Sequence, residues 1–209
     1  MEHVFHFEPL NKPQEEARKL YQKNDLIFLT GVAGTGKTYC AVALALADLN
    51  ESKHKEHFYL ARPAVEGEEK LGFLPGTAAE KLNPYLLPIY DCIDDLLGKE
   101  STARYRIDKM TEIIPLAFMR GRSLNRSVCL MDEGQNLTYK QMKMFLTRLG
   151  KGSKMIVMGD PTQLDIPEQR SGLMDAIEKM CEVPGVAHVH FDENAVVRHP
   201  LVVEVLKRL

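Results

Sequence analysis

Short runs of apolar residues alternate along the chain with longer segments in which apolar residues recur every three to four positions. The short runs, which favour buried strands, are 26–30, 57–61, 112–116, 126–131, 154–158 and 186–191. The segments with helical spacing are about 10–23, 37–50, 138–149, 172–180 and 200–209. Apolar strands that alternate with helices are typical of a parallel sheet covered by helices on both faces. The pattern therefore predicts a three-layer α/β fold.

Local signals mark where some of these helices begin and end. Asn11 is a good N-cap for the first helix, and Gln14 stands three residues later, where a capping box is closed. Thr138 and Gln141 repeat this spacing at a later helix, which we expect Gly150 to stop.

The stretch 62–110 departs from the regular alternation. It opens with a long segment that has no clear period, and Thr77 then caps a helix that we expect Pro84 and Pro88 to interrupt. Seven residues of this helix supply an apolar face: Leu82, Leu86, Leu87, Ile89, Ile93, Leu96 and Leu97. We interpret residues 62–110 as an insertion outside the sheet of a single domain that spans 1–209.

Composition narrows the class of protein. The 209 residues are 44% apolar and 27% charged, as in ordinary soluble proteins, and the net charge of -2 provides no bulk attraction to nucleic acid or membranes. The N-terminus lacks the basic start of a signal peptide, and no apolar run is long enough to span a bilayer. The four cysteines lie far apart, which favours free thiols in a reducing compartment. We expect a cytoplasmic protein with no membrane segment.

The strand at 26–30 leads into a glycine-rich turn and a helix. The turn fits the phosphate-loop pattern and reads Gly31, Val32, Ala33, Gly34, Thr35, Gly36, Lys37, Thr38, with Tyr39 next in the helix. Its glycines let the backbone N–H groups point inward at the positive end of that helix. Lys37 is suited to the β- and γ-phosphates, and the Thr38 hydroxyl to Mg²⁺. The sequence therefore predicts a site for a nucleoside triphosphate and Mg²⁺.

Two more strand ends carry polar residues. Asp132 and Glu133 follow the strand at 126–131, and Gln163 comes soon after the strand at 154–158. Ligands of parallel sheets bind at the carboxyl ends of strands, so we expect these groups to meet the phosphate loop. Asp132 is suited to bind Mg²⁺, and Glu133 is suited to polarise an attacking water. Gln163 is suited to sense the γ-phosphate. An isolated pair of acids would more often be a solvated strand end.

Three histidine pairs invite a zinc interpretation: His3 and His6, His54 and His57, His188 and His190. None has a cysteine or acid at ligand spacing. Mg²⁺ is the only metal that we expect.

Several blocks carry a family resemblance. Segments 31–38, 132–136 and 159–163 resemble motifs I, II and III of superfamily-one helicases, and 10–14 resembles their adenine-reading Q motif. Segments 62–66, 69–76 and 197–202 are similar to the PhoH family of P-loop ATPases. The resemblance implies a RecA-like P-loop NTPase that binds ATP, with Gln14 at the adenine. It also implies phosphate and Mg²⁺ binding by residues 34–38 with Asp132, water activation by Glu133 and γ-phosphate sensing by Gln163.

Superfamily-one helicases complete their site with arginines from a second nucleotide-fold domain, for which 209 residues leave no room. A cation on the transition state is worth about 10³–10⁵ in rate. We therefore expect a homo-oligomer, a hexameric ring, in which a neighbouring subunit supplies Arg198 or, as second choice, Arg170. The alternative for Arg198 is an ordinary surface or helix-entry arginine.

Arg62 follows a strand end where helicase relatives contact a nucleic-acid strand, and Arg120 and Arg122 would add positive charge. Scattered basic residues are usually only solvated, and the chain has no tryptophan for base stacking. Two functions stay open. One is an ATP-driven motor that binds single-stranded RNA and either unwinds RNA or feeds it to a separate nuclease. The other is a nucleotide-dependent ring that remodels or scaffolds a protein partner. A phosphate-loop kinase is a distant third.

Overall fold

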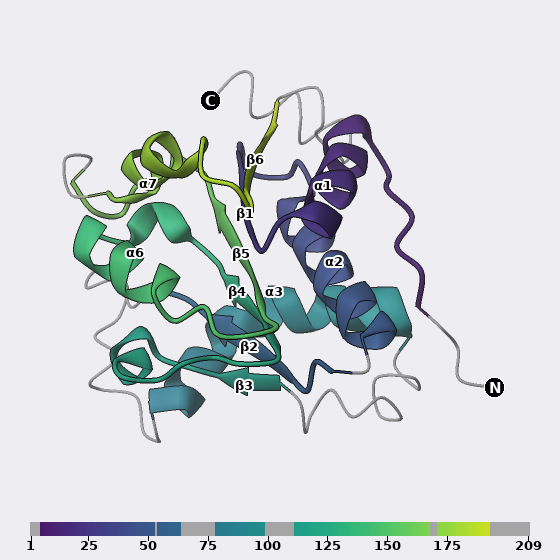
Figure 1. The fold of residues 1–209 in the computed structure, drawn as a ribbon, viewed down its shortest axis with the longest axis horizontal. Coiled ribbons are helices and arrows are strands. Elements are labelled where there is room, and N and C mark those ends of the chain that lie inside the picture. The colour runs from purple at the N-terminus through teal and green to yellow at the C-terminus, as the bar shows by residue number, and fades with distance from the viewer. Residues whose placement is uncertain (1–4, 53, 64–77, 99–110, 168–170, 193–209) are drawn as a thin grey trace.

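The computed structural model describes residues 5–52, 54–63, 78–98, 111–167 and 171–192. The elements, labelled as in Figure 1, are α1 (Lys12–Lys23), β1 (Leu26–Gly31), α2 (Lys37–Glu51), β2 (His57–Ala61), α3 (Ala78–Leu97), β3 (Thr111–Ile113), η2 (Leu116–Met119), β4 (Ser127–Met131), η3 (Gly134–Asn136), α6 (Tyr139–Leu146), β5 (Lys154–Gly159), α7 (Leu173–Met180) and β6 (Val186–Phe191). The predicted strands 57–61 and 186–191 match the observed bounds. The predicted helix 200–209 lies outside the described residues.

The strands form one six-stranded sheet in the order β3-β2-β4-β5-β1-β6, and every pairing is parallel. Helices α1, α2 and α3 lie on one face, and α6 and α7 lie on the other (Figure 1). The predicted three-layer α/β fold, RecA-like in its architecture, is therefore confirmed. Since β5 runs between β1 and β4, the loops that follow these three strands emerge side by side.

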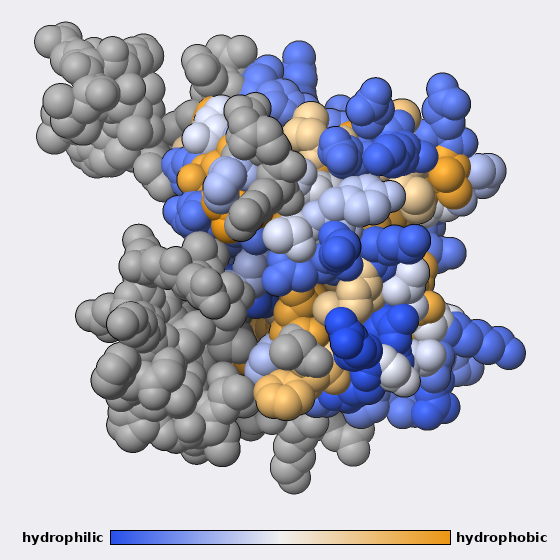
Figure 2. Space-filling model, turned by 90° about the vertical axis from the view of Figure 1, so that its left-hand side faces the viewer, coloured by the Kyte–Doolittle hydropathy of each residue, from blue (hydrophilic) through white to orange (hydrophobic). Residues whose placement is uncertain are grey.

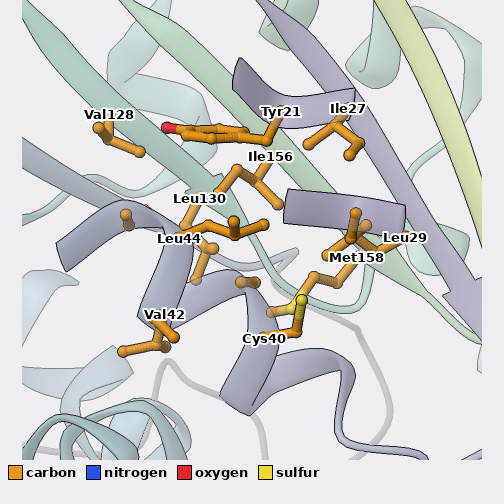
Figure 3. Close-up of a cluster of buried hydrophobic side chains, with 14 of the residues drawn as sticks. Tyr21, Ile27, Leu29, Cys40, Val42, Leu44, Val128, Leu130, Ile156 and Met158 are labelled. Atoms are coloured by element: carbon orange, nitrogen blue, oxygen red, sulfur yellow. The ribbon is translucent and has the colours of Figure 1, made fainter. Parts of the chain in front are cut away.

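Each face of the sheet buries its own apolar cluster. Ile27 and Leu29 of β1 point toward α1 and α2, whereas Phe28 between them points toward α6 and α7. Figure 3 shows the first cluster, in which α2 side chains such as Val42 and Leu44 pack against strands β1, β4 and β5. Residues 40–46 of α2 are all buried, because this helix is covered by the sheet on one side and by α1 and α3 on the others.

Several boundaries differ from the predictions, among them the end of α6, which lies at Leu146 and not at Gly150. The third strand, predicted over 112–116, ends at Ile113. The Ile114 N–H still donates to the Leu60 carbonyl, and the chain then turns at Pro115 into η2, which begins at Leu116.

The predicted break in the helix after Thr77 is also wrong, because α3 runs without interruption from Ala78 to Leu97. Pro88 is exposed, so water can replace the backbone hydrogen bond that a proline removes. Ile89 and Ile93 of the same helix are fully buried against the core and hold it in place. Thr77, its expected cap, lies outside the described residues.

The side of the molecule that carries α6 and α7 is largely polar. Figure 2 looks at the side of α6 and α7, where small apolar areas are separated by hydrophilic side chains. Among the described residues, none of the helices combines the length and apolar character that a transmembrane span needs.

The capping box at α6 gives a test of the fold. Thr138 Oγ1 accepts a hydrogen bond from Gln141 N at 3.3 Å, and Gln141 Oε1 accepts one from Thr138 N at 2.9 Å. We predict that Thr138→Ala lowers the free energy of unfolding by about 1 kcal/mol, measured by urea denaturation. Thr147→Ala, which removes an exposed hydroxyl beyond the end of α6, is the control and should cost less than about 0.5 kcal/mol. Equal losses would contradict a specific role for the cap.

Candidate functional site

A cavity of about 470 Å³ lies where the loops after β1, β4 and β5 meet. Its lining joins several distant parts of the chain: Leu10, Gln14, Ala33, Gly34, Gly36, Lys37, Thr38, Tyr39, Cys92, Asp132, Glu133, Met158, Gly159, Asp160 and Gln163. The residues predicted to bind phosphate, Mg²⁺ and the attacking water thus surround a single space.

The phosphate loop is a curled backbone that only glycine permits. Gly34 and Gly36 have φ angles of +84° and +82°, in the left-handed region. At Gly31, a Cβ would lie 2.0 Å from the carbonyl oxygen of Phe191 on the neighbouring strand β6. The buried Thr35 ties the loop together by donating its hydroxyl hydrogen to the Val32 carbonyl at 2.9 Å. The left-handed glycines and this hydrogen bond hold the loop in its curled shape.

Lys37, the first residue of α2, reaches back over this loop. Its ammonium group donates to the carbonyl oxygens of Gly31 and Val32 at 2.6 and 2.8 Å. The first N–H groups of a helix have no acceptor within the helix, and they carry the positive end of its dipole. The loop, Lys37 and the start of α2 together form a site for a polyphosphate.

The two acids stand directly beyond β4. Asp132 Oδ1 accepts a hydrogen bond from Glu133 N at 3.0 Å, and Glu133 has a φ of +53°, which is rare outside glycine. The Arg62 guanidinium, at the end of β2, lies 3.8 Å from Asp132 Oδ2 and 3.5 Å from Glu133 Oε1. Arg62 is therefore an ion-pair partner of both acids, and its contact with nucleic acid stays a prediction.

Burial and the negative charge of Glu133 raise the pKa of Asp132 to about 6, against the opposing influence of Arg62 and Lys37. Such a carboxylate gains from a cation. Asp132 and the Thr38 hydroxyl, both in the cavity lining, are hard oxygen donors of the kind that Mg²⁺ prefers. The donor set therefore fits the predicted metal.

Gln135 is a functional residue that the sequence did not single out. It is buried, and its Nε2 donates to Glu133 Oε2 at 2.6 Å and to the Gln163 carbonyl at 2.9 Å. Its Oε1 accepts a hydrogen bond from Asp160 N at 3.1 Å. Gln135 thus joins the acids after β4 to the loop after β5. The available signal was its place in the block that resembles helicase motif II.

Gln14, on α1, is a further buried residue of the cavity lining. Asn11 caps α1 as predicted, accepting a hydrogen bond from Gln14 N at 3.0 Å. The Gln14 Oε1 accepts one from Leu10 N at 2.8 Å, which fixes the side-chain amide within the cavity wall. Its role at an adenine stays a prediction.

The remaining predicted residues fall elsewhere. Arg122 forms two hydrogen bonds with Glu112 at 2.9 and 3.4 Å and lies over the Tyr59 ring, and Arg120 is exposed. Arg170 and Arg198 lie outside the described residues. On α3, Cys92 lines the cavity, and burial raises the pKa of its thiol to about 11, so it is protonated at neutral pH.

A family model described as PhoH-like protein matches residues 6–209. A PhoH-like protein of Bacillus subtilis (strain 168) is 48% identical over 195 residues, covering 93% of this chain and 61% of the relative. Protein PhoH of Escherichia coli (strain K12) is 43% identical over 195 residues, covering 91% of this chain and 54% of the relative. The chain thus spans less than two thirds of the length of these curated relatives.

A solved structure with a similar fold is the large terminase from a thermophilic bacteriophage. The TM-score is 0.59 at 14% sequence identity, and the match covers 96% of this chain and 50% of that chain. At this identity the likeness concerns the fold alone.

The raised pKa of Asp132 predicts that this side chain, when ionised, lowers the stability of the folded protein. Because its pKa is higher in the folded protein than the unperturbed 3.8, the folded state binds the proton more tightly, and this contribution to stability is lost as pH rises toward 6. Asp132→Asn should therefore raise the melting temperature of the ligand-free protein at about pH 7.5, with a smaller gain at about pH 5. Asp175→Asn, at an exposed position of α7, is the matched control and should change the melting temperature little. A loss of stability at the higher pH would refute the account.

Proposed function

Since the chain belongs to the PhoH-like protein family, we propose that it is a Mg²⁺-dependent ATPase that forms a ring and acts on RNA. The observation that carries the hydrolytic part is the meeting of Lys37, Thr38, Asp132, Glu133 and Gln163 around one cavity. A phosphate loop alone would suit binding or transfer to many acceptors. A carboxylate and an amide added beside it suit water as the acceptor.

In the proposed hydrolysis, each of these side chains has a distinct role. Lys37 and the N–H groups of the phosphate loop hold the β- and γ-phosphates, and Thr38 and Asp132 would hold Mg²⁺, which neutralises charge that develops on the phosphate oxygens. Glu133 orients a water and accepts its proton as the water oxygen bonds to the γ-phosphorus. The bond between the γ-phosphorus and the bridging oxygen breaks, giving ADP and phosphate.

Arg62 supports a link between hydrolysis and a nucleic-acid strand. Its guanidinium faces both acids at 3.5–3.8 Å. A phosphate of RNA bound beside β2 would compete for the same guanidinium and free Glu133 for the attacking water. RNA should then increase the rate of hydrolysis, and the increase should weaken with salt.

Glu133→Gln tests hydrolysis and RNA action together. We predict a loss of about 10²–10⁴ in turnover with nucleotide affinity retained, because the amide keeps the shape of the side chain but accepts no proton. Glu178→Gln, an exposed residue of α7, is the matched control. Turnover by the wild type should rise with single-stranded RNA at low salt. If added RNA leaves turnover unchanged and the Glu133→Gln variant captures one protein, the results would instead favour the protein-remodelling function.

The ring proposal concerns Arg198, with Arg170 as second choice. If a neighbour supplies Arg198, Lys37→Ala and Arg198→Ala should each be inactive alone, while their mixture regains activity at shared interfaces. Random assembly would restore about a quarter of the wild-type rate. Light scattering should give the mass of a hexamer. A monomer that hydrolyses ATP at the full rate would exclude a trans-acting arginine.

A further inference from the structure

Asp160 is a cavity residue to which neither the sequence nor the assigned reaction gives a task. It follows β5 directly, and only 5% of its surface is exposed. Its Oδ1 accepts two hydrogen bonds, from Thr162 N at 2.9 Å and from the Thr162 hydroxyl at 2.6 Å. Its Oδ2 is buried, and no donor of the described residues reaches it. One half of this carboxylate is therefore satisfied by its own turn, and the other half is not.

A buried carboxylate oxygen without a donor is unfavourable, so native structures rarely keep one without a ligand or water. The location of Asp160 identifies the kind of ligand. Gly159 pairs with Thr30, the residue before the phosphate loop, and Asp160 N is bound by Gln135, whose amide also binds Glu133. Asp160 therefore belongs to the phosphate end of the cavity, between the loop and the catalytic acids.

We propose that Asp160 Oδ2 accepts a hydrogen bond from a water molecule of the bound nucleotide complex. A phosphate oxygen would be repelled by the carboxylate, whereas water carries hydrogens that bridge two acceptors. Two waters share this chemistry at the phosphate end: one that is bound to Mg²⁺ and the one that attacks the γ-phosphorus. The inference rests on the proposed ATPase function and adds a third acid, after Asp132 and Glu133, to the carboxylates that serve it.

Asp160→Asn is the sharpest test. The asparagine Oδ1 can keep the turn with Thr162, while an amino group, which donates, replaces the accepting Oδ2. Calorimetry with an ATP analogue that cannot be cleaved measures affinity in Mg²⁺ and in EDTA, and single-turnover assays measure ATP cleavage. If the water is bound to Mg²⁺, affinity in Mg²⁺ should fall about 10- to 100-fold with affinity in EDTA unchanged. If it is the attacking water, cleavage alone should fall by about that factor.

Thr162→Val is the matched control. It removes one hydrogen bond to Oδ1 and leaves Oδ2 in place, so affinity and cleavage should stay within about threefold of the wild type. If Thr162→Val reproduces Asp160→Asn, Asp160 merely shapes the turn and the inference is wrong. Asp160→Ser guards against misfolding, because its hydroxyl can accept from Thr162 N and leaves room for an added water; melting curves of the ligand-free variants report folding.

The outcomes separate this inference from the function on which it rests. A wild type that binds no nucleotide would overturn both. A wild type that binds and cleaves ATP, with Asp160→Asn and Asp160→Ser within about twofold of it in every measurement, would overturn the role of Asp160 alone.

Discussion

The place of β5 between β1 and β4 is the constraint on which the rest of the site depends. A parallel sheet releases its strands at one edge, so neighbours in the sheet become neighbours at the ligand even when they are distant in the chain. β1 delivers the phosphate loop, β4 delivers Asp132 and Glu133, and β5 delivers the loop from Asp160 to Gln163. A different strand order would separate these groups, although each local motif would be unchanged.

This arrangement brings several charged groups close together. Asp132 and Glu133 are adjacent acids, the first of them largely buried, and Glu133 adopts a backbone conformation that side chains disfavour. Arg62 offsets part of this charge, and Lys37 lies near enough to lower the pKa of Asp132 while donating to two loop carbonyls. In the proposed function, phosphates would pair with Lys37 and Mg²⁺ would pair with Asp132, which offsets part of this charge. Binding should therefore stabilise the fold as well as fill the cavity.

The sequence predicted the sheet, the helix caps Asn11 and Thr138, and the phosphate loop, because each depends on local spacing. Strands 57–61 and 186–191 are apolar runs with clear ends, and the Thr138 cap is a three-residue pattern. The continuity of α3 through two prolines was not predictable, because burial of Ile89 and Ile93 outweighs a local penalty. The contacts of Gln135 and Arg62 were equally hidden, since both join segments that only the strand order brings together.

Gln135 shows how a neutral side chain can make such a site respond as a unit. Its amide nitrogen donates to Glu133 and to the Gln163 carbonyl, and its amide oxygen accepts from Asp160 N. With donor and acceptor ends both engaged, the amide has one favourable orientation, and no charge is added beside the acids. Asn136 forms a second link to the same loop through two hydrogen bonds with Asp165. In the proposed reaction, a shift of Glu133 toward a water would therefore be passed through Gln135 to the loop that carries Gln163.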